Sequence, residues 1–221
     1  MKTLVIFDLD GTLLDTVADL AAAVNYSLGT LGFPTHATSR YYDFVGHGIY
    51  HLFRCALPAD ARTEENVMAV KSLFVPYYDQ HNTDHTEPYP GIAELLEQLQ
   101  AKGFSIAIAS NKYEAATIGL MKDYFSHIRF SSIHGQREGV PVKPDPTIVH
   151  DICKESSTPA ENCIYVGDSD VDIQTARNAG VPAIAVSWGF RPRTELESLN
   201  PDAIADTSAE LFEQIMKLSE K

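Results

Sequence analysis

The sequence predicts an α/β fold: a Rossmann-like parallel sheet core with helices on both faces and an inserted, mainly α-helical cap. Three observations support this prediction. A short run of apolar, largely β-branched residues, 3–7, opens the chain. From residue 91 onward, short apolar stretches alternate with stretches of helical spacing, punctuated by Gly and Pro. Between these regions, residues 16–85 show mainly helical spacing.

The first two elements follow from simple patterns. Residues 3–7 have no polar alternation, which is typical of a strand buried on both faces in the middle of a parallel sheet. Apolar residues then recur with helical spacing through residues 14–32. Gly32 followed by Pro34 supplies the signal that ends this helix.

The remainder of the insertion predicts two more helices. A glycine-flanked loop precedes a short helix over residues 49–57. A longer helical pattern covers residues 64–80, and Pro76 is expected to kink it. Residues 82–91 are rich in His, Asp, Thr and Pro, so we expect a linker that returns the chain to the sheet.

From residue 91 the alternation of β and α segments predicts a parallel sheet with right-handed crossovers. The predicted helices cover residues 92–102, 114–122, 146–155 and 171–178. The predicted strands cover residues 104–109, 128–132, 163–166 and 183–186. We therefore divide the chain into an α/β core, residues 1–14 and 90–221, and an inserted helical domain, residues 16–85. Because the insertion follows the first strand, it leaves from the carboxyl edge where such sheets bind ligands, as a cap would.

Composition limits the class of protein. Of the 221 residues, 44% are hydrophobic and 21% are charged, which excludes a disordered or fibrous chain. Lys and Arg number 17 against 30 Asp and Glu, so the formal net charge is −13. Nucleic acids and anionic membranes need a basic footprint, so neither is an expected partner. A small anionic substrate stays compatible, because one local cation reverses the field within a cleft.

Cysteine usage and the N-terminus bear on the compartment. Cys55, Cys153 and Cys163 are an odd number without CxxC spacing, which argues against a disulfide framework or a cysteine zinc site. The apolar run 4–7 is too short for the hydrophobic region of a signal peptide, and no run approaches the ~18 apolar residues of a membrane helix. We expect a cytoplasmic protein.

Two acidic residues follow the first strand. Asp8 and Asp10 are two apart, so both side chains point to one side if the strand persists, and Gly11 lets the chain turn away. Adjacent carboxylates repel and are best tolerated around a cation or a shared proton. The alternative is a loop that opens with solvated acids.

A second acidic cluster follows another predicted strand. Asp168 takes the same kind of position as Asp8, and Asp172 lies one turn into the next helix. Together the two strand ends make an oxygen-rich pocket suited to a hard cation, most plausibly Mg²⁺. The alternative for Asp168 and Asp172 is capping of that helix.

Three residues are candidates for binding an anion. Ser110 and Asn111 follow a predicted strand and enter a helix, where hydroxyl, amide and backbone N–H groups donate hydrogen bonds. Lys143 is held between two proline-rich turns before another helix, and in this acidic chain it is placed to balance a phosphate or a carboxylate. The alternatives are a plain helix cap and a solvated loop lysine.

These four signals, in this order, resemble the motifs of the haloacid dehalogenase-like hydrolases. The likeness covers the whole chain, and its most specific part is Asp8–Thr16, Asp-Leu-Asp-Gly-Thr-Leu-Leu-Asp-Thr. The length and position of the insertion resemble the helical C1-cap group, and within it the chain is most similar to phosphoglycolate phosphatases. The closer likeness is carried by Val45-Gly46-His47-Gly48, Lys143-Pro144-Asp145-Pro146 and Trp188-Gly189-Phe190-Arg191.

The resemblance implies a Mg²⁺-dependent phosphomonoester hydrolase that works through an aspartyl-phosphate. It implies that Asp8 is the nucleophile and that Asp10 protonates the leaving oxygen and later takes a proton from water. Mg²⁺ would be held by the Asp8 carboxylate, the backbone carbonyl of Asp10 and Asp168. Asp172 would act as an indirect or water-mediated partner of the metal.

The remaining roles are implied in the same way. Ser110, Asn111 and Lys143 would hold the phosphate oxygens and the charge that develops on them. Substrate recognition would fall to the cap loop, and we expect Arg40 to face the site with it. The expected loop residues are Gly46, His47 and Gly48. The expected substrate is a small phosphate ester such as 2-phosphoglycolate.

Several alternatives stay open. A pyrophosphatase or a phosphosugar mutase could use the same core. A haloacid dehalogenase would use Asp8 without Mg²⁺, and Asp10 argues against it. A non-enzymatic phospho-Asp receiver lacks a large cap. The pairs His47/His51 and His81/His85 have helical i, i+4 spacing but no evident third zinc ligand. The sequence leaves monomer and dimer equally open.

Overall fold

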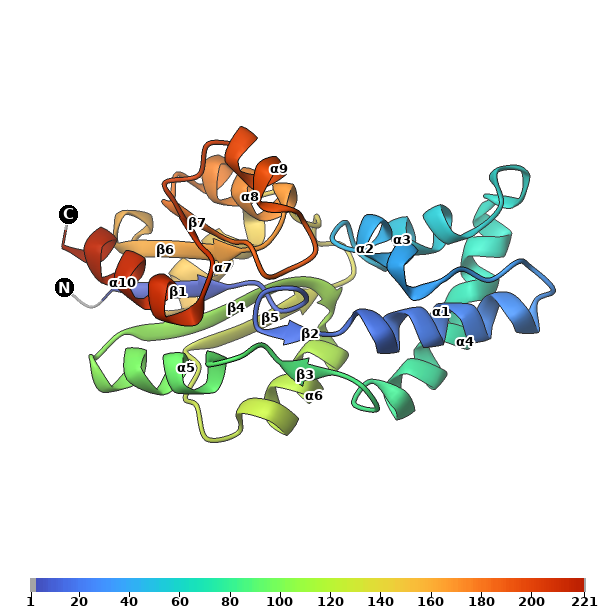
Figure 1. The fold of residues 1–221 in the computed structure, drawn as a ribbon, viewed down its shortest axis with the longest axis horizontal. Helices are drawn as coiled ribbons and strands as arrows, with labels where there is room; N and C mark the ends of the chain where they lie inside the picture. The colour runs from blue at the N-terminus through green and yellow to red at the C-terminus, as the bar shows by residue number, and fades with distance from the viewer. Residues whose placement is uncertain (1–2, 221) are drawn as a thin grey trace.

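A computed structural model describes residues 3–220 and contains a six-stranded sheet whose strands are all parallel (Figure 1). Their spatial order is β5 (Ser132–Gln136), β4 (Ser105–Tyr113), β1 (Leu4–Phe7), β6 (Cys163–Gly167), β7 (Ala183–Val186) and β8 (Ala203–Ala205). Strand β1 is central, paired with β4 on one side and β6 on the other, and all its residues are buried. The prediction of a parallel α/β sheet is confirmed.

The two faces of the sheet carry different helices because side chains alternate along β1. Val5 and Phe7 pack in one core cluster with α5 (Ile92–Ala101), α6 (Glu114–Phe125) and α10 (Ser208–Ser219). Leu4 and Ile6 pack in another cluster, with α7 (Thr147–Glu155) and α8 (Asp170–Ala179). A short helix, α9 (Arg193–Ser198), lies between β7 and β8. The sheet is thus covered on both sides, and its carboxyl edge is left for ligands.

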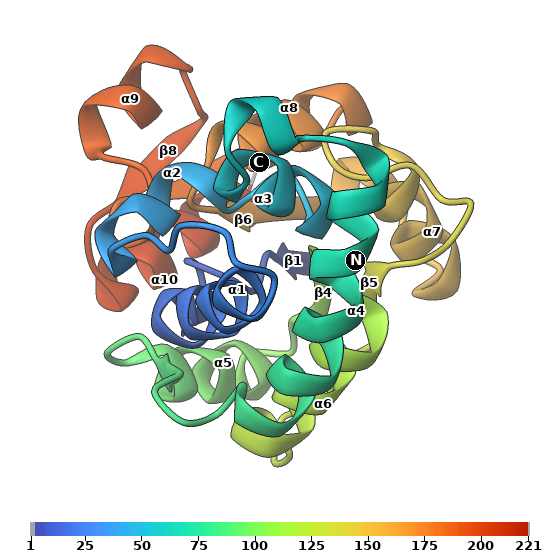
Figure 2. The ribbon, with the colours of Figure 1, turned by 90° about the vertical axis from the view of Figure 1, so that its right-hand side faces the viewer.

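The helical insertion lies beyond the carboxyl end of β1: Figure 1 shows its helices to the right of the sheet, and Figure 2, viewed from that side, shows them in front of it. It contains α1 (Val17–Thr30), α2 (Tyr41–Phe44), α3 (Ile49–Ala56) and α4 (Glu64–His81), with short 3₁₀ turns at Thr38–Arg40 and Ala59–Ala61. Most of its apolar residues form a core cluster of their own.

Two short strands join the insertion to the sheet. β2 (Leu14–Asp15) pairs antiparallel with β3 (Glu87–Pro88), so the outgoing and returning chains are bonded together. Beside them, the buried Asp19 on α1 accepts hydrogen bonds from the backbone N–H groups of His85 and Thr86 and from the Thr86 hydroxyl. Because Leu14 and Asp15 form β2, the first helix starts at Val17 and not at residue 14 as predicted.

Other boundaries also differ from the prediction. The strand predicted at 128–132 is wrong in its bounds, because the observed β5 covers Ser132–Gln136. β5 is an edge strand with few apolar residues, so its sequence lacks the signal of a buried strand. Strand β4 continues to Tyr113, beyond the expected end at 109. No helix within residues 3–220 combines the length and the apolar character needed to cross a bilayer.

Candidate active site

The carboxyl ends of β1, β4 and β6 bring the predicted residues together. Asp8 follows β1, Ser110 lies near the end of β4 and Asp168 follows β6. The β4–β5 register shifts between Ala109 and Tyr113, so the stretch that contains Ser110 departs from regular pairing. Irregularities of this kind re-aim side chains, and here they bring consecutive residues of β4 to one cleft.

Lys143 is the centre of a buried charged cluster. Its side chain is 1% exposed, and its Nζ lies 2.7 Å from Asp172 Oδ1 and 3.0 Å from Asp8 Oδ1. Nζ also donates to the carbonyl oxygen of Ala109 and the hydroxyl of Tyr165, each at 3.0 Å. Burial would lower the pKa of Lys143, but Asp172 and Asp8 together raise this pKa well above its usual value. The lysine is therefore a fixed, buried ammonium beside Asp8.

Three carboxylates cluster beside this single ammonium, which pairs with two of them, Asp8 and Asp172. Ligand oxygens of Asp8, Asp168 and Asp172 lie within 4.8 Å of one another. Burial, then Asp172, raises the pKa of Asp8 to about 7, although Lys143 opposes the rise. Burial, then Asp172 and Asp8, also raises the pKa of Asp168 well above its usual value. Burial is the first cause of both shifts, and repulsion from neighbouring carboxylates adds to it.

The residues present fit a divalent cation. Asp8 Oδ1 is buried, accepts no aligned hydrogen bond and touches Lys143 only as an ion-pair partner. A buried carboxylate oxygen that lacks an aligned hydrogen bond, beside two further acids, belongs to the kind of donor set that a hard cation prefers. Bound there, the cation would relieve the repulsion that raises the pKa of Asp8.

Asp168 is held rigidly from two sides. It accepts from the Thr12 hydroxyl at 3.1 Å and from the backbone N–H of Phe190 at 2.7 Å. Gly11, at φ +84°, passes so close that a Cβ there would lie 2.3 Å from Asp168 Oδ2. Only glycine combines this backbone conformation with this approach. The turn after Asp10 and the carboxylate of Asp168 therefore depend on each other.

Asp172 plays two structural parts. Its Oδ2 accepts from the backbone N–H and the hydroxyl of Ser169, the capping residue of α8, at 3.1 and 2.6 Å. Its Oδ1 accepts from Lys143. The capping alternative considered for Asp172 therefore holds, and so does its contact with the charged cluster. Both oxygens of Asp172 are thus engaged, one with the Lys143 ammonium and one with the start of α8.

Asp10 belongs to a separate pair. Its Oδ1 accepts from the Thr16 hydroxyl at 2.7 Å and lies 3.2 Å from the Nζ of Lys112. Lys112 is 4% exposed and was not identified from the sequence. The available signal was its position three residues beyond the predicted strand end, next to Ser110 and Asn111. Without the longer β4, that position indicated only a helix lead-in.

Asn111 ties two loops together. Its Nδ2 donates to the carbonyl oxygens of Gly46 at 2.9 Å and Lys143 at 3.1 Å, and its Oδ1 accepts from the Lys143 N–H at 2.8 Å. The side-chain amide is thus engaged with protein groups. Ser110 is 2% exposed and its Oγ accepts from the Lys112 N–H, so its own hydroxyl proton stays available to a ligand.

A cavity that is partly open to solvent lies between the sheet edge and the insertion. Its sheet side is polar and includes Asp8, Asp10 and Ser110. Its insertion side is apolar apart from the backbone of Gly46 and Gly48. The apolar side chains that the insertion contributes to the lining are Leu20, Val45, Ile49, Leu52 and Phe74.

Two residues expected at the site lie outside this cavity. Arg40 has a 61% exposed side chain that pairs with Asp43 at 3.3 Å, so the expectation that it faces the site is wrong. Gly46 and Gly48 line the cavity, but the His47 side chain does not, and its Nε2 lies 3.8 Å from Asp170 Oδ2. The loop thus presents backbone to the cavity and directs its imidazole outward.

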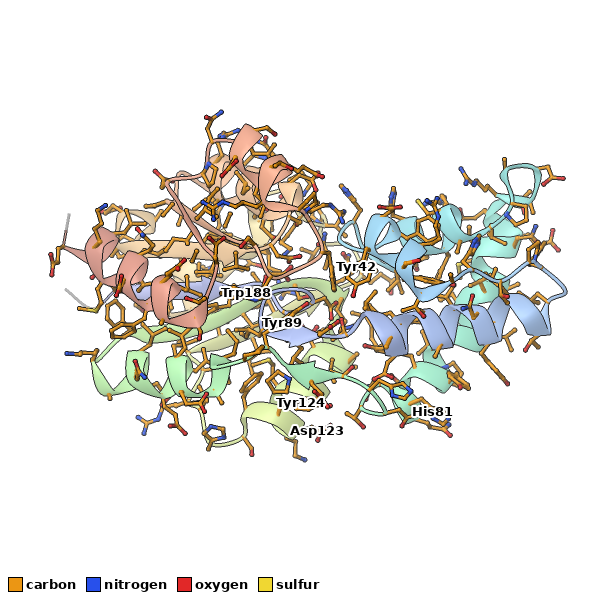
Figure 3. The ribbon with its side chains drawn as sticks, viewed as in Figure 1. Tyr42, His81, Tyr89, Asp123, Tyr124 and Trp188 are labelled. Atoms are coloured by element: carbon orange, nitrogen blue, oxygen red, sulfur yellow. The ribbon has the colours of Figure 1, made fainter. Side chains whose placement is uncertain are left out.

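Aromatic residues close one side of the junction. Figure 3 labels Tyr89 and Trp188 next to each other beside the loop after β1, with their ring centroids 6.4 Å apart. The Trp188 indole N–H donates to the Thr12 carbonyl oxygen at 3.1 Å, which fixes that loop. Tyr42, on the insertion side, meets Phe190 edge to face at 5.6 Å.

The comparisons with known proteins identify the class. Residues 5–186 match the family model described as "Haloacid dehalogenase-like hydrolase", and the chain belongs to this family. Phosphoglycolate phosphatase of Mesorhizobium japonicum is 31% identical, with 98% of this chain and 97% of that protein covered. Phosphoglycolate phosphatase of Pseudomonas syringae pv. tomato is 34% identical, over 93% of this chain and 77% of that protein.

Solved structures agree. The crystal structure of a predicted phosphoglycolate phosphatase from Haemophilus somnus superposes with a TM-score of 0.89 at 27% identity, covering 97% of this chain and 98% of that one. The family recognised from the sequence is confirmed, and so is the expectation of a hydrolytic enzyme similar to phosphoglycolate phosphatases. The roles of the individual site residues stay predictions.

Proposed function

We propose that this protein hydrolyses small phosphate monoesters with the help of Mg²⁺, and that Asp8 is transiently phosphorylated. The observation that carries the proposal is the state of Asp8: buried at the cavity floor, with an unbonded oxygen 3.0 Å from a fixed ammonium. The names of its relatives point to 2-phosphoglycolate as the first substrate to test.

The reaction divides into two steps. In the first, an Asp8 oxygen attacks phosphorus, the P–O bond to the alcohol breaks, and Asp10 supplies the proton that the leaving alkoxide needs. In the second, Asp10 takes a proton from water as that water attacks the acyl phosphate, which releases inorganic phosphate and restores Asp8. Lys143, the Ser110 hydroxyl and nearby backbone N–H groups would stabilise the equatorial phosphoryl oxygens.

The proposed metal ligands are the carboxylates of Asp8 and Asp168 and the backbone carbonyl of Asp10. When bound, the cation neutralises part of the charge shared by phosphate and carboxylates and lowers the cost of bringing them together. Asp172 would keep Lys143 and the start of α8 in place. The two carboxylate positions are supported by the clustering of acidic oxygens around Asp8, and the carbonyl position is what the family resemblance implies.

We propose that the insertion, residues 16–85, acts as a cap. Its apolar lining would exclude water from the phosphoryl group, which strengthens every charged contact inside the cavity. The polar sheet side would bind phosphate, while the insertion side would select the alcohol by size. A cytoplasmic location and a small-molecule partner stay predictions, as does the choice between monomer and dimer.

The test is a panel of phosphate esters, including 2-phosphoglycolate, assayed with Mg²⁺ and with chelator. We expect metal-dependent release of phosphate, and acid-quenched protein whose Asp8 peptide carries the mass of one phosphoryl group. Metal-independent turnover, or a label elsewhere in the chain, would overturn the proposal. Preference for pyrophosphate, or return of the phosphoryl group to a sugar hydroxyl, would favour the two alternatives on this core. A stable adduct without turnover would indicate a receiver.

A further inference from the structure

Lys112 brings together groups from both parts of the molecule. It lies on β4, while its Nζ donates to the hydroxyl of Tyr78, on α4 of the insertion, at 2.8 Å. Nζ also lies 4.5 Å from the centre of the Tyr78 ring and 3.2 Å from Asp10 Oδ1. Lys112 and Tyr78 are both buried. The ammonium therefore bridges the insertion and the carboxylate of Asp10.

A buried ammonium is a costly choice at this position. Its desolvation is offset only where partners of opposite charge and good geometry are present. Within residues 3–220, Asp10 is the carboxylate that forms an ion pair with Lys112. An apolar side chain of similar length would pack against the Tyr78 ring without that cost, but it would remove the bond that Lys112 donates to the buried Tyr78 hydroxyl. Lysine at this position therefore serves Tyr78 and Asp10 together.

The hydrogen bonds to Asp10 are one-sided. Thr16, which precedes α1, and Lys112, from β4, both contact Oδ1. No donor within the described part of the chain, residues 3–220, is bonded to Oδ2. A carboxylate fixed through one oxygen keeps the other free to exchange a proton. In a cavity that Asp10 lines, the free oxygen is the one that can meet a substrate.

We propose that Lys112 is a positioning residue that, with Tyr78, holds Asp10 in the orientation in which Oδ2 can protonate the leaving group. Because Tyr78 belongs to α4, this orientation depends on the insertion being seated on the sheet. The inference rests on the proposed function, in which Asp10 is the general acid, and it assigns to Lys112 a part in the first step.

The test compares Lys112→Met with the unaltered protein on two esters. The nitrophenolate of p-nitrophenyl phosphate leaves without a proton, whereas a simple alkyl phosphate needs one. The parameter is kcat/KM, because it reports on events up to departure of the alcohol and is insensitive to the later attack of water. We expect kcat/KM to fall by about 100-fold for the alkyl ester, and by less than about 5-fold for the aryl ester.

Two comparisons separate the possible failures. Asp10→Asn should also lower kcat/KM more for the alkyl ester than for the aryl ester, and the difference should be larger than for Lys112→Met. If Asp10→Asn affects both esters equally, the proposed acid role fails, whatever Lys112 does. If Asp10→Asn lowers kcat/KM mainly for the alkyl ester, but Lys112→Met lowers it equally for both esters, the proposed function survives and this inference is overturned.

Further variants guard against a purely structural effect. Tyr78→Phe keeps the ring and removes one hydrogen bond, so we expect a loss of about 5-fold on the alkyl ester only. It carries the test if Lys112→Met does not fold, and an equal loss on both esters would then count against the inference. Ile215→Val, buried in α10 and outside the cavity lining, is the control for lost stability and should leave the ratio of the two esters unchanged.

Discussion

The two buried lysines of the cleft, Lys143 and Lys112, differ in how many carboxylates surround them. Lys143 contacts Asp8 and Asp172, and Asp168 completes the same cluster. Lys112 contacts Asp10 alone among acidic groups of residues 3–220. Both ammonium groups are almost fully buried, with side chains 1% and 2% exposed. The difference therefore lies in charge balance and not in solvent access.

Charge balance predicts what each cluster still needs. Three carboxylates around one ammonium leave a negative excess, which a divalent cation would neutralise. The pair of Lys112 and Asp10 is balanced and needs no further ion. The first cluster is built from the α/β part of the chain only, whereas the second includes Tyr78 from the insertion. We infer that one cluster serves metal and phosphate, and that the other depends on the seated insertion.

The largest effect is expected from Asp8→Asn. It removes the proposed nucleophile, so kcat should fall by about 10⁴-fold or more, the scale at which essential catalytic groups act. It also removes one negative charge from the crowded cluster, so the metal-free protein should be at least as stable as before. Initial rates and thermal unfolding measure the two effects. Asp8→Ala is the control against deamidation of the new asparagine. Near-normal turnover in either variant would contradict the assignment of Asp8 as the nucleophile.

Replacing each lysine by methionine compares the clusters directly. Lys143→Met leaves three buried carboxylates without a cation, so we expect the free energy of unfolding to fall by about 3–5 kcal/mol. Lys112→Met leaves Asp10, which is 13% exposed and keeps the Thr16 bond, so the loss should be about 2 kcal/mol. Urea unfolding in chelator measures both. Equal losses would show that the two clusters do not differ in charge balance.

Burial and the charge excess together predict an unusual pH dependence in the metal-free protein. The pKa of Asp8 is raised from 3.8 to about 7, and that of Asp168 is raised as well. Between pH 3.8 and about 7, Asp8 holds a proton in the folded protein that it has lost in the unfolded chain. Because the folded state then binds more protons, the contribution of Asp8 to stability is largest at low pH and falls as pH rises from about 4 to about 7.

Urea unfolding at several pH values, with chelator and with Mg²⁺, tests this prediction. Bound Mg²⁺ should remove most of the slope and stabilise the protein by about 2.7 kcal/mol at a free concentration about 100 times its Kd. Asp8→Asn should flatten the slope without metal. A metal-free stability that rises through this pH window would contradict the assignment of excess negative charge.

Much of the Lys143 cluster could be predicted from the sequence. Asp8 and Asp168 each follow a short apolar strand, and parallel strands place their carboxyl ends at one edge. The Lys112 pair could not be found in this way. It depends on the extension of β4 past Ala109 and on the seat of Tyr78 against it, both set by tertiary packing. The bounds of the edge strand β5 were not predicted either, because the strand is polar and lacks the apolar pattern of a buried strand.

The smallest effect is expected where the insertion and the sheet part meet away from both clusters. Arg191, between β7 and α9, donates to the carbonyl oxygens of Tyr42 at 2.5 Å and Val45 at 3.0 Å. These bonds hold the loop that brings Gly46 and Gly48 to the cavity. Arg191→Gln should raise KM by about 5- to 10-fold, the effect of one or two hydrogen bonds, with kcat changed little.

Steady-state kinetics on the preferred ester measure this effect, and Arg193→Gln is the matched control. Arg193 is a neighbouring arginine on α9 that pairs with Glu197 and Asp206, and within residues 3–220 it forms no hydrogen bond or ion pair with the insertion. A fall in kcat that matches the rise in KM would show that Arg191 acts on the transition state. The loop with Gly46 and Gly48 would then contribute to the chemical step, as the Lys112–Asp10 pair does. Placing the insertion on the sheet and orienting Asp10 would be a single event.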